Sequence, residues 1–202
     1  MDGPTFDLEQ SFISRGMVRV AGIDEVGRGP LAGPVTAAAV VLDPAAIPEG
    51  LNDSKKLSAK RRAALLPLIM AHAEVSVAHA SVEEIDEINI LRAAHLAMVR
   101  ALEGLVCPPD HALIDGTMIP RGIDCPASAI VKGDARCLSI AAASIVAKCT
   151  RDAIMVDLAQ QHPGYGWETN MGYGAKAHLS ALRALGPTPH HRRSFKPVYQ
   201  ML

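Results

Sequence analysis

Apolar positions along the chain follow two different periodicities, and together these predict a mixture of strands and helices. Five short apolar segments are typical of strands, and they cover residues 17–24, 35–42, 74–80, 112–114 and 127–131. Apolar residues at three-to-four spacing predict helices over residues 58–72, 81–104, 138–159 and 175–185. Because strands interspersed with helices are typical of a mixed sheet covered on both faces, the pattern favours an α/β fold.

The residues at the helix ends sharpen two of these boundaries. Ser81 and Glu84 have the spacing of a capping box, which predicts a helix that begins there and runs to Gly104. Ser58 is a candidate N-cap for an earlier helix, but Pro67 lies inside that helix and is expected to kink or interrupt it.

A length of 202 residues fits one ordinary domain. Residues 1–16 show no periodicity and predict a flexible N-terminal arm. The remaining residues, 17–202, are expected to form a single domain that includes a helical C-terminal extension from about residue 163.

Composition excludes several classes of protein. The chain is 49% hydrophobic and 20% charged, which is the range of globular proteins rather than disordered ones. The longest strongly apolar runs, such as residues 35–42, are far shorter than the roughly 20 residues of a membrane helix. The first residues are acidic and mixed, unlike a secretion signal, so we expect a cytoplasmic protein without membrane contact.

The net charge of −1 predicts no partner, but its distribution is informative. No acidic residue follows Glu168, whereas that stretch contains the cations Lys176, Arg183, Arg192, Arg193 and Lys196. A second basic cluster covers residues 55–62. Five of the seven aromatic residues also lie beyond position 164. Cations interleaved with aromatic rings suit phosphates and stacked bases or sugars, although a solvated basic helix with aromatic anchors fits equally well.

Acidic residues lie where the predicted strands end. Asp24 and Glu25 end the first strand, Asp115 ends the fourth, and Asp134 follows the fifth. If these strands are neighbours, the four carboxylates converge on one sheet edge and repel one another unless cations neutralise them. Two divalent ions would balance the charge, and oxygen-only ligands favour Mg²⁺ or Mn²⁺ over zinc. The alternative is that they are ordinary turn residues, since Asp and Gly are common in turns.

Asp24 and Glu25 raise a geometric question because adjacent residues of a strand point to opposite faces. Both can face a metal site only if the strand breaks between them, or if one of them contributes its backbone carbonyl.

The segment Gly27-Arg28-Gly29 is glycine-rich but fits neither common nucleotide-binding loop. It lacks the Lys and Ser/Thr of a Walker loop, and Pro30 with the following strand replaces the helix of a dinucleotide site. Glycines allow close backbone approach to a ribose-phosphate, and Arg28 adds a charged donor. Such a loop could detect a 2′-hydroxyl, the group that separates RNA from DNA. A tight turn between two strands is the alternative.

Taken in order, the motifs of this chain resemble those of the bacterial type 2 ribonucleases H, the ribonuclease HII family. The segments are AGIDEVGRGPLAG (21–33), LNDSKKL (51–57), LIDG (113–116), VKGD (131–134), AASIVAK (142–148), TRD (150–152), GYG (172–174) and HRRSF (191–195). The resemblance implies an RNase H-like fold, with a mixed five-stranded sheet, flanking helices and a helical C-terminal extension.

The resemblance also implies the functional residues. It identifies Asp24, Glu25, Asp115 and Asp134 as catalytic carboxylates that hold two Mg²⁺ or Mn²⁺ ions. It implies that Gly27, Arg28 and Gly29 contact the ribonucleotide, that Tyr173 packs on the sugar, and that Lys55 lies near the substrate phosphates.

The activity implied by the resemblance is endonucleolytic hydrolysis of the RNA strand of RNA–DNA hybrids. It includes cutting 5′ of single ribonucleotides in duplex DNA, with 5′-phosphate and 3′-hydroxyl products, in replication and repair. The expected partner is the nucleic acid alone, bound by a monomer without an obligate protein partner. Two alternatives stay open: a metal-dependent DNA nuclease, and a non-catalytic nucleic-acid-binding module.

Other polar residues in these segments have plainer expected roles. We expect Asp152 to form an ion pair that holds its helix and His95 to lie in the core. His190 and His191 fit either a place near a substrate phosphate or an exposed tail.

Overall fold

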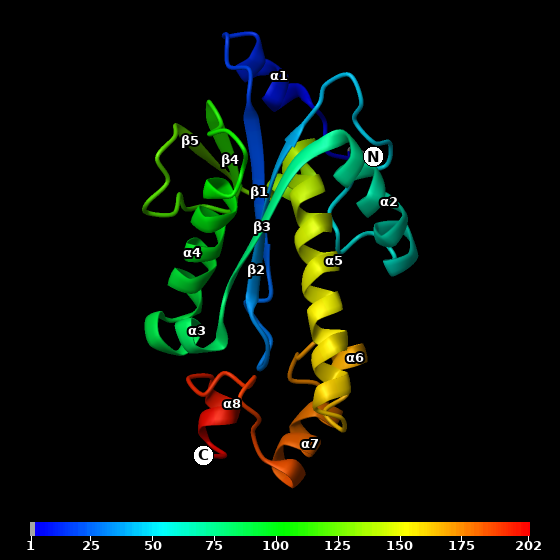
Figure 1. The fold of residues 1–202 in the computed structure, drawn as a ribbon, viewed down its shortest axis with the longest axis vertical. Helices are drawn as coiled ribbons and strands as arrows, with labels where there is room; N and C mark the ends of the chain where they lie inside the picture. The colour runs from blue at the N-terminus through cyan, green and yellow to red at the C-terminus, as the bar shows by residue number, and fades with distance from the viewer. Residues whose placement is uncertain (1–2) are drawn as a thin grey trace.

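A five-stranded sheet with helices on both faces forms the body of the protein, in a computed structural model that describes residues 3–202 (Figure 1). The strands are β1 (Val20–Val26), β2 (Val35–Leu42), β3 (Ala73–Ala80), β4 (His111–Asp115) and β5 (Ala127–Ile130). Their order is β3-β2-β1-β4-β5, with β1, β4 and β5 parallel and β2 antiparallel to both of its neighbours. The predicted α/β class and the mixed five-stranded sheet are confirmed.

Helices cover both faces of this sheet. They are α1 (Asp7–Ile13), α2 (Ala59–His72), α3 (Val82–Ile88), α4 (Ile90–Glu103), α5 (Leu138–Gln161), α6 (Trp167–Asn170), α7 (Lys176–Leu185) and α8 (Lys196–Tyr199), with a 3₁₀ turn at Gly133–Ala135. In Figure 1, α3 and α4 lie on one side of the sheet and α2 and α5 on the other. The C-terminal end of α5 extends past the sheet, and α6, α7 and α8 gather there.

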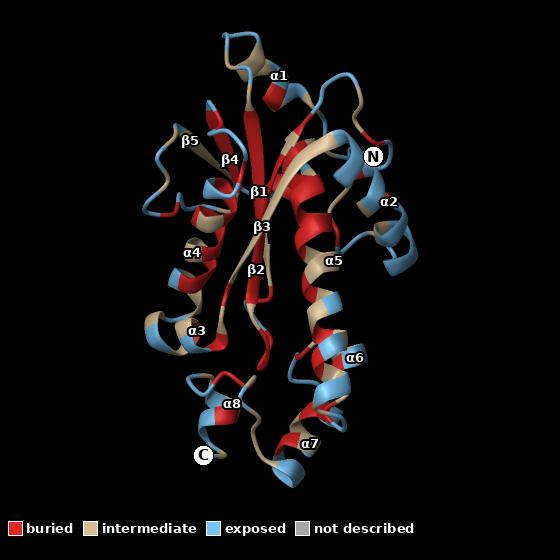
Figure 2. Ribbon diagram, viewed as in Figure 1, coloured by how far each residue is buried: buried red, intermediate tan, exposed pale blue. Residues whose placement is uncertain are grey.

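The core consists of two aliphatic layers, one on each face of the sheet. Ala37 and Ala39 of β2 pack with α4, whereas Ala38 and Val40 of the same strand pack with α2 and α5. Figure 2 shows buried residues along β1 and on the inner sides of both long helices. Because alternate residues of a strand face opposite sides, a strand buried on both faces is apolar at nearly every position, as β2 is at all positions except Thr36.

Gly22 brings the first turn of α5 into contact with β1. A Cβ atom at this position would overlap the backbone of Ser139 and Ile140, so only glycine permits the observed approach. The N-terminal end of α5 is therefore fixed directly against the strand that carries Asp24 and Glu25.

The prediction of a loose arm over residues 1–16 is wrong for the segment that contains α1. Thr5 pairs with Cys137, and the carboxylate of Glu9 accepts hydrogen bonds from the backbone N–H and hydroxyl of Ser139 at 2.8 and 2.6 Å. Phe12 stacks on His111 with ring centroids 4.0 Å apart. These contacts come from distant residues, so local periodicity could not reveal them. Residues 1 and 2 of the predicted arm lie outside the described residues.

Two helix predictions need correction. The capping box of Ser81 and Glu84 is present, but the helix expected over residues 81–104 divides into α3 and α4 at Asn89. Asn89 has a φ of 69°, and its side chain caps α4 by accepting the N–H groups of Leu91 and Arg92. Pro67 does not interrupt α2, which is continuous from Ala59 to His72.

The predicted C-terminal helical extension is confirmed, and it has a small core of its own. Trp167 and Leu182 are buried there against Met155 of α5 and Val198 of α8. Among residues 3–202, no helix has both the length and the apolar character needed to cross a membrane.

Candidate active site

The sheet topology brings three of the predicted acids together. Strand β1 carries Asp24 and Glu25, and its parallel neighbour β4 ends at Asp115. One carboxylate oxygen from each of these residues lies within 4.8 Å of the other two. The condition that the strands be neighbours is therefore met, and the interpretation of these acids as isolated turn residues is wrong for this cluster.

The structure answers the geometric question about Asp24 and Glu25 differently from either expected solution. Strand β1 is unbroken between them and pairs with β2 as far as Val26. Oδ1 of Asp24 accepts a hydrogen bond from the backbone N–H of Glu25 at 2.7 Å, which turns the carboxylate along the strand. Both side chains consequently reach the same cluster without a strand break.

Asp134 lies beside the cluster of three rather than in it. Its 3₁₀ turn is fixed because Oδ1 of Asp115 accepts a hydrogen bond from the backbone N–H of Gly133 at 2.7 Å. Burial, Asp53 and Asp115 raise the pKa of Asp134. The acid of β4 thus positions the turn that carries the fourth acid.

Asp53 is a site residue that the sequence analysis did not assign. Its carboxylate is close enough to raise the pKa of Asp134, and it also accepts a hydrogen bond from the backbone N–H of Lys55 at 2.9 Å. The signal was its place in the LNDSKKL segment, two residues before Lys55, the candidate phosphate ligand.

The acids strongly disfavour one another's ionisation. Asp24 is only 7% exposed, and burial together with Glu25, Asp115 and Asp134 raises its pKa well above the usual range. Burial also raises the pKa of Glu25, although Arg28 partly offsets this. The cluster therefore concentrates negative charge that the surrounding protein compensates incompletely.

Two of the predicted substrate-binding cations face this negative charge. Partial burial alone would lower the pKa of Lys55, but Asp24, Asp134 and other nearby acids raise it overall. Nη1 of Arg28 lies 3.3 Å from Oε1 of Glu25, and half of the Arg28 side chain is exposed. Both cations are thus placed beside the carboxylates.

Tyr173 meets the glycine-rich loop although 144 residues separate it from Gly29. A Cβ atom on Gly29 would lie 3.4 Å from Cε1 of the tyrosine ring, which is 45% exposed. The structure therefore brings Gly29 and Tyr173 together at one exposed surface, as the resemblance implies.

Two buried histidines, His178 and His191, are linked by hydrogen bonds to the backbone of Tyr173. Nδ1–H of His178 donates to the carbonyl of Tyr173 at 2.8 Å, because Nε2 of His178 accepts from Nε1 of Trp167. Nε2–H of His191 also donates to Nε2 of His178 at 3.1 Å, and Nδ1 of His191 accepts from the N–H of Thr188. Burial lowers the pKa of His191 to about 4. His191 is therefore neither an exposed tail residue nor a free phosphate ligand.

His95 was expected to lie in the core, but it lines a pocket beside the acids. This pocket of about 190 Å³ is also lined by Glu25, Arg28, Asp115 and Thr117. Burial, and then the charge of Arg28, lower the pKa of His95. The apolar spacing of α4 could not distinguish a core position from this pocket wall.

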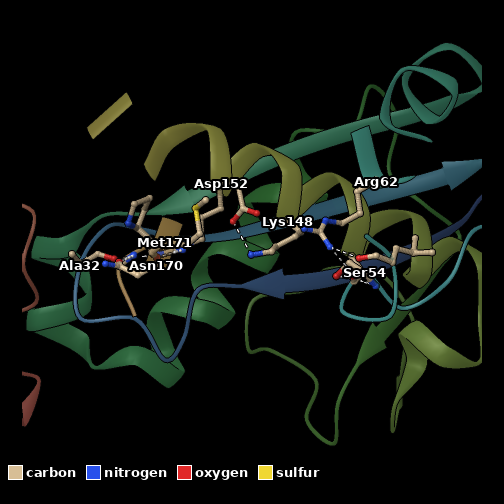
Figure 3. Close-up of polar contacts among 12 residues, drawn as sticks. Ala32, Ser54, Arg62, Lys148, Asp152, Asn170 and Met171 are labelled. Carbon is tan, nitrogen blue, oxygen red and sulfur yellow. Dashed lines mark hydrogen bonds and ion pairs between the residues drawn. The ribbon is translucent and has the colours of Figure 1, made fainter. Parts of the chain in front are cut away.

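Helix α5 passes two loops near the site, the loop of Ser54 and Lys55 and the loop of Asn170 and Met171 (Figure 3). Lys148 and Asp152 form the predicted ion pair, with Nζ 2.7 Å from Oδ1. On one side of this pair, Arg62 donates to the carbonyl of Ser54; on the other side lie Ala32 and Met171. Helix α5 therefore spans from the lysine-bearing loop to the loop that precedes Tyr173.

Clustered carboxylates of this kind fit divalent cations. Asp24, Glu25 and Asp115 supply oxygen donors from a rigid strand pair, and their mutual repulsion is the kind that bound cations relieve. Asp134 lies outside this group of three but is close enough to help raise the pKa of Asp24. The donor set contains neither sulfur nor imidazole, so its ligands are all hard oxygens.

Comparison with known proteins identifies a family. The family model for ribonuclease HII matches residues 21–198. A ribonuclease HII from Roseobacter denitrificans is 71% identical over 187 residues, which is 93% of this chain and 94% of that protein. A ribonuclease HII from Ruegeria pomeroyi is 65% identical over 202 residues, 100% of this chain and 86% of that protein. The crystal structure of ribonuclease H2 from Pyrococcus horikoshii matches with a TM-score of 0.76 and 27% identity, covering 91% of this chain and 97% of that one.

Proposed function

This chain belongs to the ribonuclease HII family, and we propose that its reaction takes place at the carboxylates of Asp24, Glu25, Asp115 and Asp134. The chain is a ribonuclease H, an endonuclease that hydrolyses the RNA strand of RNA–DNA hybrids. The observation that carries the site assignment is the convergence of three carboxylates within 4.8 Å on neighbouring parallel strands.

The four carboxylates would hold two divalent ions, Mg²⁺ or Mn²⁺. Ions bound there supply a Lewis acid to the attacking water and to the departing 3′-oxygen. Asp24 and Glu25 would contribute carboxylate ligands from the central strand. Asp115 would contribute a ligand too, and it also orients the turn that carries Asp134 by accepting the N–H of Gly133. The products of this displacement are a 5′-phosphate and a 3′-hydroxyl.

The loop of Gly27, Arg28 and Gly29 would recognise the ribonucleotide, including a single ribonucleotide in duplex DNA. Among the described residues, the backbone N–H groups of Arg28 and Gly29 donate no hydrogen bond to the protein, so both remain available to a ligand. Tyr173 lies against Gly29 and would pack on the sugar. Lys55, held beside the acids, would bind a substrate phosphate.

The test uses a labelled DNA duplex with one ribonucleotide, an all-DNA duplex, and Mg²⁺, Mn²⁺ or chelator. We expect a metal-dependent cut 5′ of the ribonucleotide, no cut in the all-DNA duplex, and loss of cutting in Asp115→Asn. The matched control is Asp157→Asn, which neutralises an exposed acid of α5 outside the cluster and should cut normally.

The outcomes separate the alternatives. Equal cutting of both duplexes would favour a DNA nuclease and would remove the role of Arg28. Tight binding without cutting in any metal, by a folded protein, would favour a binding module.

A further inference from the structure

Two arginine side chains of the protein are fully buried, and their hydrogen bonds go to backbone carbonyls rather than to acids. Arg151 of α5 and Arg192 of the C-terminal segment are both 0% exposed. We propose that they are positioning residues, which hold the loop of residues 27–34 and fix it relative to Tyr173. The inference rests on the proposed role of this loop in recognising the ribonucleotide.

The guanidinium of Arg192 lies inside the loop, which turns around it. Nη2 donates to the carbonyls of Gly27, Gly33 and Pro34 at 2.6, 2.8 and 3.1 Å. Nη1 donates to the carbonyls of Arg28 and Pro30 at 3.1 and 2.8 Å, and Nε donates to Gly33 at 2.9 Å. Five carbonyls of one loop are thus directed at a single planar cation.

This arrangement determines which side of the loop faces outward. Because the carbonyls of Gly27, Arg28 and Pro30 are directed inward to Arg192, the peptide groups present their N–H side away from it. The N–H groups of Arg28 and Gly29 have no protein acceptor among the described residues. Arg192 therefore orients the N–H groups of Arg28 and Gly29 toward the place where a 2′-hydroxyl or phosphate oxygen would bind.

Arg151 connects the loop to the segment that precedes Tyr173. Nε and Nη2 donate to the carbonyls of Pro34 and Ala32 at 2.9 and 3.0 Å, while Nη1 donates to Met171 at 2.9 Å. The backbone N–H of Leu31 donates to Gly172 at 2.7 Å and strengthens the same connection.

Gly27 is part of this packing. It has a φ of +96°, and a Cβ atom there would overlap the Arg151 side chain. The absence of a side chain at Gly27 thus leaves room for the Arg151 side chain on the buried side of the loop. The absence of a side chain at Gly29 leaves room for the Tyr173 ring on the exposed side.

Burial of these cations is costly for the protein, which argues for a specific role. Burial lowers the pKa of Arg192 to about 9 and that of Arg151 to about 10. An apolar side chain could fill the space at lower cost, but it could not direct five carbonyls. Lysine could not do so either, since its ammonium has three donors and no planar fork.

The test is Arg192→Lys, which keeps the charge and loses the fork. We expect kcat on the duplex with one ribonucleotide to fall about 100-fold, as for a reacting group misplaced by about 1 Å. KM should change little, because the phosphate contacts remain, and stabilisation of the protein by Mn²⁺ should match wild type. In Arg192→Gly, methylguanidinium in solution should restore part of the lost kcat.

Matched variants make the result specific. Arg100→Lys removes the fork of an arginine that pairs with Glu84 away from the loop, and it should cut normally. Arg151→Lys repeats the test if Arg192→Lys fails to fold. A folded Arg192→Lys with unchanged kcat would overturn the inference, and so would failure of both variants to fold, because the arginines would then serve overall stability. If wild type does not cut, the proposed function fails instead.

Discussion

The carboxylate cluster should destabilise the metal-free protein, so Asp24→Asn is expected to stabilise it while abolishing activity. Carboxylate oxygens of Asp24, Glu25 and Asp115 lie within 4.8 Å, and each such pair costs about 3 kcal/mol at an effective dielectric constant of about 20. Asparagine removes the charge and keeps an oxygen that can accept the N–H of Glu25. Partial protonation in wild type reduces the gain, so we expect the free energy of unfolding to rise by about 1–3 kcal/mol.

The pH dependence has a definite sign. The pKa of Asp24 is raised in the folded protein, so the native state binds more protons than the unfolded state between the usual pKa of about 3.9 and the raised value. Wild-type stability therefore falls as the pH rises through this window. The advantage of Asp24→Asn should be complete above the folded pKa and should shrink below it.

Urea unfolding with chelator, and then with Mg²⁺, measures these effects. Chelated Asp24→Asn should unfold at higher urea than wild type, and Mg²⁺ should stabilise wild type more than the variant. Asp157→Asn, the exposed acid outside the cluster, should behave like wild type in both conditions. An Asp24→Asn protein that is no more stable than wild type in chelator would refute the reasoning.

Three further predictions concern residues around the site. Because burial lowers the pKa of His191 from 6.5 to about 4, the free energy of unfolding should fall by up to about 3 kcal/mol as the pH drops across that interval. The urea midpoint of His191→Gln should depend less on pH than that of wild type. An identical pH dependence would contradict this prediction. Gly22→Ala should lower the free energy of unfolding by about 1–3 kcal/mol or more, because the new Cβ atom overlaps α5. Gly3→Ala should lower it by almost nothing, and thermal melts of both variants measure the difference. Tyr173→Ala should lower kcat/KM on the ribonucleotide duplex about 10–100-fold at unchanged Tm, whereas Tyr173→Phe should retain most activity if the ring itself packs on the sugar.

Local patterns predicted the elements and the acidic edge because their causes are local. Strand β2 is apolar except at Thr36 because both of its faces are buried, and Asp115 follows the short apolar run of β4. The family motifs suggested roles that periodicity cannot, including the roles that we propose for Arg28 and Tyr173. The parallel pairing of β1 with β4 brings Asp24 and Asp115 together, and the docked C-terminal region brings Tyr173 to Gly29.

Other features depend on tertiary contacts, and the sequence concealed them. Arg192 looked like one of several surface cations in a basic stretch, yet it is completely buried. Helix α1 has only seven residues, and Glu9 is anchored by Ser139, which lies 130 residues away. Asp53 had no assigned role, because nothing local indicates that Asp134 lies beside it.

The hydrogen bonds of Arg192 to the loop of residues 27–34 have a consequence for when this loop can become fixed during synthesis. Arg192 is separated from its loop partners by 158 to 165 residues, so this contact is among the most non-local in the fold. During synthesis, the strands that carry Asp24 and Asp115 are made well before Arg192. Because a domain folds as a unit, the loop that we propose recognises the ribonucleotide can gain its fixed shape only after residue 192 has been made.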